Sequence, residues 1–132
     1  MSAGKKFRDA LKYNNPLIIP GAINAYSAIL AERAGHQAIY LSGGGVAAAS
    51  YGLPDLGITS MEDVLIDVKR ISNASSLPLL VDIDTGWGGA FNISRTIKEM
   101  VNAGCAAVHM EDQISQKRCG HRPNKSLVSS NE

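Results

Sequence analysis

The stretch Leu77-Pro78-Leu79-Leu80-Val81-Asp82-Ile83-Asp84-Thr85-Gly86 decides the fold class. Its first half is a continuous apolar run without polar alternation, which is typical of a strand in a parallel sheet covered on both faces. Two acidic residues and a glycine follow where this strand should end. A buried parallel strand indicates an α/β protein, in which strands alternate with helices.

The rest of the chain repeats this pattern, so that strand and helix alternate four times. We expect strands over 17–22, 37–41, 77–82 and 105–110, and helices over 4–13, 26–34, 46–50, 61–73 and 91–102. Such units build either an open doubly wound sheet or a (β/α)-barrel. The first strand–helix turn, Gly21-Ala22-Ile23-Asn24-Ala25, is not a GxGxxG phosphate loop, which weakens the dinucleotide-binding alternative.

Composition bounds the class of protein. The chain has 132 residues, enough for one ordinary domain, and 45% of them are hydrophobic. Its net charge of +1 implies no general affinity for nucleic acid or for a membrane surface. Its two cysteines, Cys105 and Cys119, are too few for a disulfide scaffold and fit a reducing cytoplasm.

Polar and glycine residues cluster directly after the expected strand ends. Ser42-Gly43-Gly44-Gly45 follows the second strand, Asp82 and Asp84 end the third, and Glu111 and Asp112 follow the fourth. In both α/β architectures the carboxyl ends of the strands form the site. This coincidence predicts an enzyme.

The carboxylates of Asp82 and Asp84 are candidates for a metal site. In an extended segment they would point the same way, and Mg²⁺ takes one or two carboxylates together with water and substrate oxygens. Asp-x-Asp-x-Gly is also common in solvated turns, which is the alternative. Glu111 and Asp55 are further acids that could reach this site, whereas His109 is more typical of a packed, hydrogen-bonded histidine than of a ligand.

The glycines of Ser42-Gly43-Gly44-Gly45 predict an anion site. Their backbone N–H groups could receive a substrate carboxylate, as a nest or a helix N-terminus does. The alternative is a tight turn that needs glycine for its conformation alone.

Lys117-Arg118-Cys119-Gly120-His121-Arg122 places one cysteine among three cations and a histidine. Neighbouring positive charge favours the thiolate form, so Cys119 is a candidate for proton transfer or nucleophilic chemistry. A basic surface loop that happens to contain a cysteine is the alternative.

Five stretches together resemble the isocitrate lyase and phosphoenolpyruvate mutase superfamily. They are Tyr40–Gly45, Gly52–Asp55, Val81–Gly86, Glu111–Gln113 and Lys117–Arg122. The cysteine loop is the most specific of them, because mutases and decarboxylases of the superfamily generally lack that cysteine. Isocitrate lyases usually read Lys-Lys-Cys-Gly-His and carry long insertions, so the resemblance is to the branch that acts on 2-methylisocitrate.

This resemblance implies a Mg²⁺-dependent retro-aldol cleavage of 2-methylisocitrate to pyruvate and succinate, in a cytoplasmic homo-oligomer that is a tetramer in the family. It implies that Asp82 and Asp84 bind Mg²⁺, with Asp55 and Glu111 near that shell. It also implies that Ser42, Gly43 and Gly44 hold substrate carboxylate, that Cys119 transfers the proton, and that Gly120 and His121 bind and orient the substrate. An isocitrate lyase-like or oxaloacetate decarboxylase-like activity is the alternative within the superfamily.

The resemblance also implies a (β/α)8 barrel, which typically takes about 250 residues. This chain supplies about four units, so residues 1–132 are expected to be the N-terminal part of a single barrel domain and inactive alone. A non-catalytic half-barrel that is stabilised by association is a second alternative.

Overall fold

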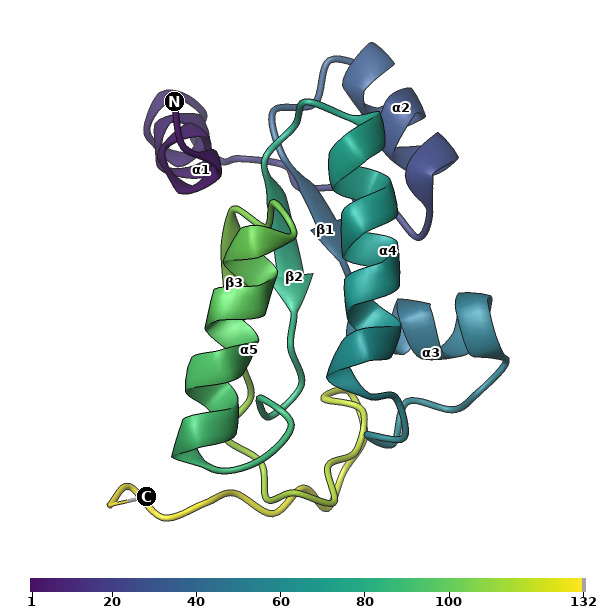
Figure 1. The fold of residues 1–132 in the computed structure, drawn as a ribbon, viewed down its shortest axis with the longest axis vertical. Helices are drawn as coiled ribbons and strands as arrows, with labels where there is room; N and C mark the ends of the chain where they lie inside the picture. The colour runs from purple at the N-terminus through teal and green to yellow at the C-terminus, as the bar shows by residue number, and fades with distance from the viewer. Residues whose placement is uncertain (132) are drawn as a thin grey trace.

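A computed structural model describes residues 1–131 as a short parallel sheet flanked by helices (Figure 1). The strands are β1 (Ile39–Leu41), β2 (Leu79–Asp82) and β3 (Ala107–His109). The helices are α1 (Ala3–Tyr13), α2 (Ala25–Arg33), α3 (Gly43–Tyr51), α4 (Met61–Ala74) and α5 (Ala90–Asn102). All three strands are parallel, in the order β1-β2-β3, with Leu41 opposite Val81 and Val81 opposite Val108.

Helices α2, α4 and α5 lie side by side along the sheet (Figure 1). The strand residues that face them, such as Ile39, Leu41, Leu79 and Val81, are fully buried. The alternate residues Tyr40 and Leu80 are only half-buried. Within residues 1–131 the helices therefore cover one face of the sheet, whereas the sequence predicted cover on both.

The expected first strand, 17–22, is wrong. The segment touches β1 only at a parallel bridge between Gly21 and Tyr40, where the Tyr40 N–H donates to the Pro20 carbonyl over 2.9 Å. Pro16 and Pro20 carry no N–H group to extend this pairing, and Ile18 is exposed. An extended segment with one bridge to β1 thus lies where the first of the four strands was expected.

Capping residues account for where helices α3 and α4 begin and where α3 ends. Ser60 caps α4 through a reciprocal capping box with Asp63, as the expected helix over 61–73 required. Helix α3 is longer than expected, because Ser42 caps it from before the glycines and Gly52 ends it in the left-handed conformation at φ 66°. Among residues 1–131, no helix has the length and apolar character needed to cross a membrane.

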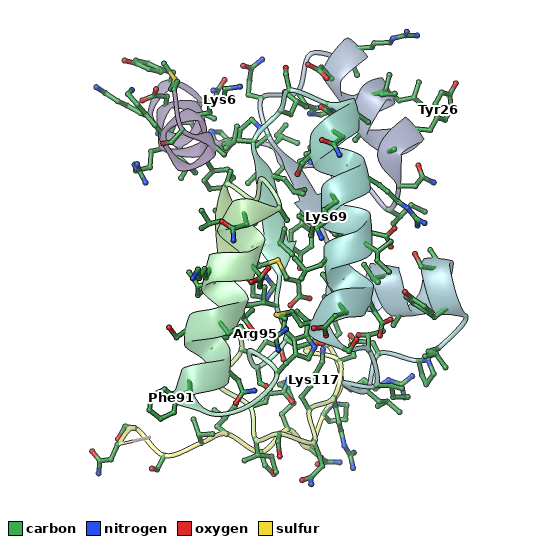
Figure 2. The ribbon with its side chains drawn as sticks, in the orientation of Figure 1. Lys6, Tyr26, Lys69, Phe91, Arg95 and Lys117 are labelled. Carbon is green, nitrogen blue, oxygen red and sulfur yellow. The ribbon has the colours of Figure 1, made fainter. Side chains whose placement is uncertain are left out.

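The carboxyl ends of β1, β2 and β3 point to one edge of the sheet, and the segment after β3 runs along that edge (Figure 1). Figure 2 shows Phe91 at the outside of the molecule and Lys117 below the end of α4, where Lys117 is buried. The buried lysine marks the position of the candidate site.

Candidate active site

Two buried carboxylates lie at the end of β2. The Asp82 carboxylate accepts the backbone N–H of Gly43 at one oxygen and that of Asp84 at the other, each over 3.1 Å. The strand ends at Asp82, and Asp84 takes a left-handed conformation at φ 49°, which is uncommon for a residue with a side chain. The two acids therefore converge through this turn, and not through the spacing of an extended strand as predicted.

The N-terminus of α3 meets these acids. A Cβ on Gly43 would lie 3.2 Å from carboxylate oxygens of both Asp82 and Asp84, and a Cβ on Gly44 would lie 2.9 Å from Asp55 Oδ2. A side chain at either position would crowd these carboxylates, so both glycines let the N-terminus of α3 lie close to the acids. The N–H of Gly43 already serves Asp82, and the N–H of Gly45 donates to Ser42 Oγ over 3.2 Å. Two of the three glycine amides in the predicted anion site therefore bind the chain's own oxygens.

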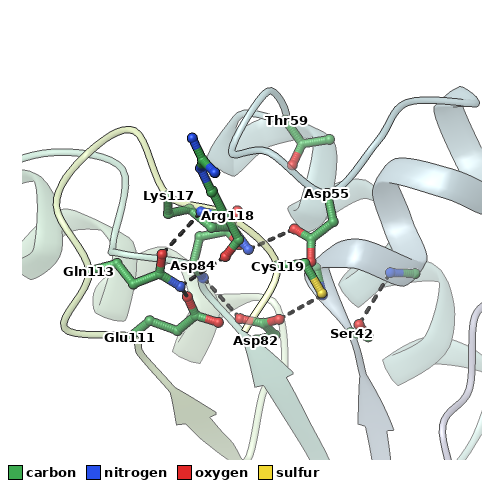
Figure 3. A network of polar contacts seen from close by, with 12 residues as sticks. Ser42, Asp55, Thr59, Asp82, Asp84, Glu111, Gln113, Lys117, Arg118 and Cys119 are labelled. Carbon is green, nitrogen blue, oxygen red and sulfur yellow. Dashed lines mark hydrogen bonds and ion pairs between the residues drawn. The ribbon is translucent and has the colours of Figure 1, made fainter. Parts of the chain in front are cut away.

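Lys117 joins the cysteine loop to the acids (Figure 3). Its side chain is 2% exposed, and its ammonium lies 2.7 Å from Asp55 Oδ1 and 2.6 Å from Asp84 Oδ1. Burial acts to lower the pKa of Lys117, but the hydrogen bonds to Asp55 and Asp84 outweigh burial and raise it. The ammonium is therefore charged, and it holds the cysteine loop against the segment between α3 and α4 and against the turn after β2.

The acids outnumber this ammonium. Burial raises the pKa of Asp84, and the neighbouring charges of Asp82 and Asp55 raise it further, although Lys117 opposes them. Lys117 faces two carboxylates, whereas Asp84 has only a share of one ammonium. Carboxylates held this close without matching positive charge suit a bound cation, so the residues present fit a hard divalent metal ion.

Asp82, His109 and Glu111 could also share a metal ion. One ligand atom from each lies within 4.8 Å of the others. His109 stacks on Tyr40, with ring centroids 5.9 Å apart, and its Nε2 lies 3.8 Å from Asp82 Oδ1. Burial and the charge of Asp82 raise the pKa of Tyr40, so its hydroxyl stays protonated at neutral pH. The Tyr40 hydroxyl lies 3.4 Å from His109 Nδ1, so His109 is hydrogen-bonded as the sequence favoured. It is not packed as expected, because its side chain is 44% exposed at the edge of the acid cluster.

Cys119 is half-buried on the loop that Lys117 anchors. Its Sγ lies 3.9 Å from His121 Nδ1, so the predicted cysteine–histidine neighbourhood is present. Gly120 lies beside Glu111, because a Cβ on Gly120 would be 3.6 Å from Glu111 Oε1. The structure thus brings the cysteine loop and the acid cluster to one edge of the sheet.

Sequence reasoning did not assign a role in the site to Lys117 or Tyr40. Lys117 belongs to the basic loop that the sequence pattern indicated. Only the tertiary structure shows that this lysine is buried against two acids that precede it by 62 and 33 residues. Tyr40 directly precedes Leu41 and Ser42 and offered no signal beyond its place at a strand end.

A phosphoenolpyruvate phosphomutase family model matches residues 7–132, which is nearly the whole chain. The chain belongs to this family. It is 70% identical, over 132 residues, to the 2-methylisocitrate lyase of Vibrio cholerae serotype O1, covering 100% of this chain and 43% of the relative. The 2-methylisocitrate lyase of Escherichia coli K12 is 63% identical, with 99% and 45% covered. The chain thus spans less than half the length of these curated relatives.

Solved structures of the same superfamily match the fold. An oxaloacetate acetylhydrolase in complex with the inhibitor 3,3-difluorooxalacetate gives a TM-score of 0.92 at 38% identity, covering 99% of this chain and 45% of the other. A 2,3-dimethylmalate lyase gives 0.87 at 39% identity, covering 99% and 44%. A phosphonopyruvate hydrolase complex with oxalate and Mg²⁺ gives 0.77 at 33% identity, covering 98% and 44%. The predicted fold class, an α/β fragment of the (β/α)8-barrel type, is confirmed.

Proposed function

We propose that the complete protein is a Mg²⁺-dependent lyase that cleaves 2-methylisocitrate to pyruvate and succinate. The observation that carries this proposal is the ion pair of Lys117 with Asp55 and Asp84, which anchors the cysteine loop beside the strand-end acids. The identity of 70% to a protein named 2-methylisocitrate lyase supports the choice of substrate. Isocitrate lyase-like and oxaloacetate decarboxylase-like activities are the alternatives.

Asp82 and Asp84 are the residues that would hold the metal ion, directly or through water, with Asp55 and Glu111 near that shell. Mg²⁺ prefers oxygen ligands, which favours these carboxylates over the nitrogen of His109. When bound, the ion supplies a Lewis acid that stabilises the negative charge developing on substrate oxygens. A structural relative at 33% identity has been solved with oxalate and Mg²⁺, which supports this assignment.

The N-terminus of α3 would hold a substrate carboxylate at Ser42, Gly43 and Gly44. The partial positive charge of a helix N-terminus favours an anion there. Because the Gly43 amide serves Asp82, that glycine would act mainly by letting substrate and acids come close. Gly120 and His121, which directly follow Cys119 in the cysteine loop, would orient the other half of the substrate.

Cys119 would supply the proton that completes the reaction. Cleavage breaks a carbon–carbon bond as the substrate hydroxyl gives its proton to water and becomes the carbonyl of pyruvate. The electron pair stays on the carbon of the succinate half, and the Cys119 thiol protonates that carbon. General acid catalysis of this kind contributes about 10²- to 10⁴-fold to a rate.

We also propose that residues 1–132 are the N-terminal part of a single barrel domain in a cytoplasmic homo-oligomer. Large apolar side chains on the outside support this, since Phe91 is 94% exposed and Ile18 68% exposed. Exposed apolar surface of this kind is typical of an interface with further protein.

The test is to assay the purified complete protein, with Mg²⁺, on 2-methylisocitrate, isocitrate and oxaloacetate in parallel. The proposal predicts pyruvate and succinate from 2-methylisocitrate at the highest kcat/KM. Glyoxylate formed faster from isocitrate would favour the isocitrate lyase alternative. Decarboxylation of oxaloacetate as the main reaction, or turnover of none of the three, would contradict the proposal.

A further inference from the structure

Gln113 lies where the chain leaves β3 and enters the cysteine loop. It is 6% exposed. The loop is closed at its neck by an antiparallel bridge between Gln113 and Leu127, and the Val128 N–H donates to the Asp112 carbonyl over 2.9 Å. This pairing fixes the base of the loop but does not reach Cys119 near its tip.

The Gln113 side chain reaches further into the loop (Figure 3). Its Oε1 accepts the backbone N–H of Arg118 over 3.0 Å, and its Nε2 donates to the Arg118 carbonyl over 2.8 Å. These two groups belong to the peptide units on either side of Arg118, one joined to Lys117 and the other to Cys119. One side chain therefore orients the backbone that leads into the thiol.

The same amide nitrogen also donates to Glu111 Oε2. An ionised carboxylate only accepts hydrogen bonds, whereas the Arg118 N–H requires an acceptor. A glutamine amide satisfies all three partners at once because it carries both kinds of group. A glutamate at this position would place a second carboxylate against Glu111 and would leave the Arg118 carbonyl without a donor.

We infer that Gln113 is a positioning residue that fixes the orientation of the Arg118–Cys119 peptide and links the cysteine loop to Glu111. The inference rests on the proposed function only for what the thiol does, not for how it is held. Lys117 anchors the loop through its side chain, and Gln113 anchors it through the adjacent backbone. Together they place Cys119 beside the acid cluster.

The test compares Gln113→Glu and Gln113→Ala with Gln116→Ala in the complete protein. Gln116 is an exposed glutamine on the same loop, which makes it a matched control. The first readout is the rate at which iodoacetamide alkylates Cys119, measured by mass spectrometry, with buried Cys105 as the internal reference. Losing one buried hydrogen bond corresponds to about a tenfold change, so both Gln113 variants should label about tenfold faster. Gln116→Ala should match the wild type.

The second readout is kinetic. The Gln113 variants should lose at least about tenfold in kcat with a smaller change in KM, because the thiol is displaced more than the substrate groups are. Alkylation rates within twofold of wild type in both variants would overturn the inference. If the wild type turned over no substrate, the proposed function would fail while the alkylation comparison still decided this question.

A third measurement needs no variant and covers the case in which the substitutions prevent folding. The Arg118 amide should exchange its hydrogen at least about a hundredfold more slowly than a free amide, since it donates to a buried side chain. Exchange of that amide at the free rate in the native protein would overturn the inference.

Discussion

Replacing Lys117 with methionine should remove the contact that joins the cysteine loop to the acids while keeping a side chain of similar length. The Lys117 side chain is 2% exposed, and its ammonium lies within 2.7 Å of oxygens from both Asp55 and Asp84. Removing one partner of a buried ion pair typically costs about 3–5 kcal/mol, because a buried charge is left uncompensated. Asp55 is 25% exposed and can be solvated in part, so we expect a loss near the lower end, about 3 kcal/mol.

Lys5→Met is the matched control for this prediction. Lys5 pairs with Asp9 at the same distance, 2.7 Å, but its side chain is 55% exposed. Such a surface pair contributes about 0.3–0.5 kcal/mol on a helix. The two variants therefore compare a buried ammonium between two carboxylates with an exposed ammonium beside one, at closely similar ion-pair distances.

The assay is urea unfolding of the complete protein, followed by circular dichroism with and without Mg²⁺. Lys117→Met should lose about 3 kcal/mol without the metal and recover part of it at millimolar Mg²⁺, since a ligand that binds only the folded state stabilises it. A loss below about 1 kcal/mol, no larger than that of Lys5→Met, would refute the reasoning.

Three further predictions concern the acids and the thiols. Asp84→Ala should abolish Mg²⁺-dependent cleavage with an unchanged circular dichroism spectrum, and near wild-type turnover with normal metal dependence would contradict the metal assignment. Cys119→Ser should lower kcat at least about a hundredfold while substrate affinity stays within about tenfold, because serine is a far weaker acid; a loss in affinity alone would make Cys119 a binding residue. Burial raises the pKa of Cys105 to about 11, so at pH 8 a thiol reagent should label Cys119 and spare Cys105 until the protein unfolds. Rapid labelling of both thiols at pH 8 would contradict the burial of Cys105. Because the Cys105 thiol ionises at lower pH in the unfolded chain than in the folded one, the free energy of unfolding should also fall as the pH rises from about 9 to 11.

Signals that depend on a few neighbouring residues were sufficient to predict most of the helices. Ser60 and Asp63 form the capping box of α4, as such residues do in many helices, whereas α3 begins three residues before the expected start. The expected strand over 17–22 failed because an apolar run alone does not ensure pairing. Pro20 has no backbone donor, and the pairing is limited to a single bridge around Gly21, in which Tyr40 bonds to Pro20 and Ala22.

The site was predictable in its location and less so in its contacts. The clustering of polar residues after strand ends located the acids, the glycines and the cysteine loop correctly at one edge. The use of Gly43 to admit the carboxylates of Asp82 and Asp84 depends on distances between segments about 40 residues apart. The burial of Lys117 likewise depends on packing across three loops, which no local pattern encodes.

The most direct test of the account is the rate of pyruvate release from 2-methylisocitrate as Mg²⁺ is removed from the complete protein and then restored. The acid cluster and the cysteine loop together predict that chelation stops pyruvate release and that added Mg²⁺ restores it. Pyruvate release that continues unchanged after the metal is removed, or no pyruvate at saturating Mg²⁺, would contradict the account.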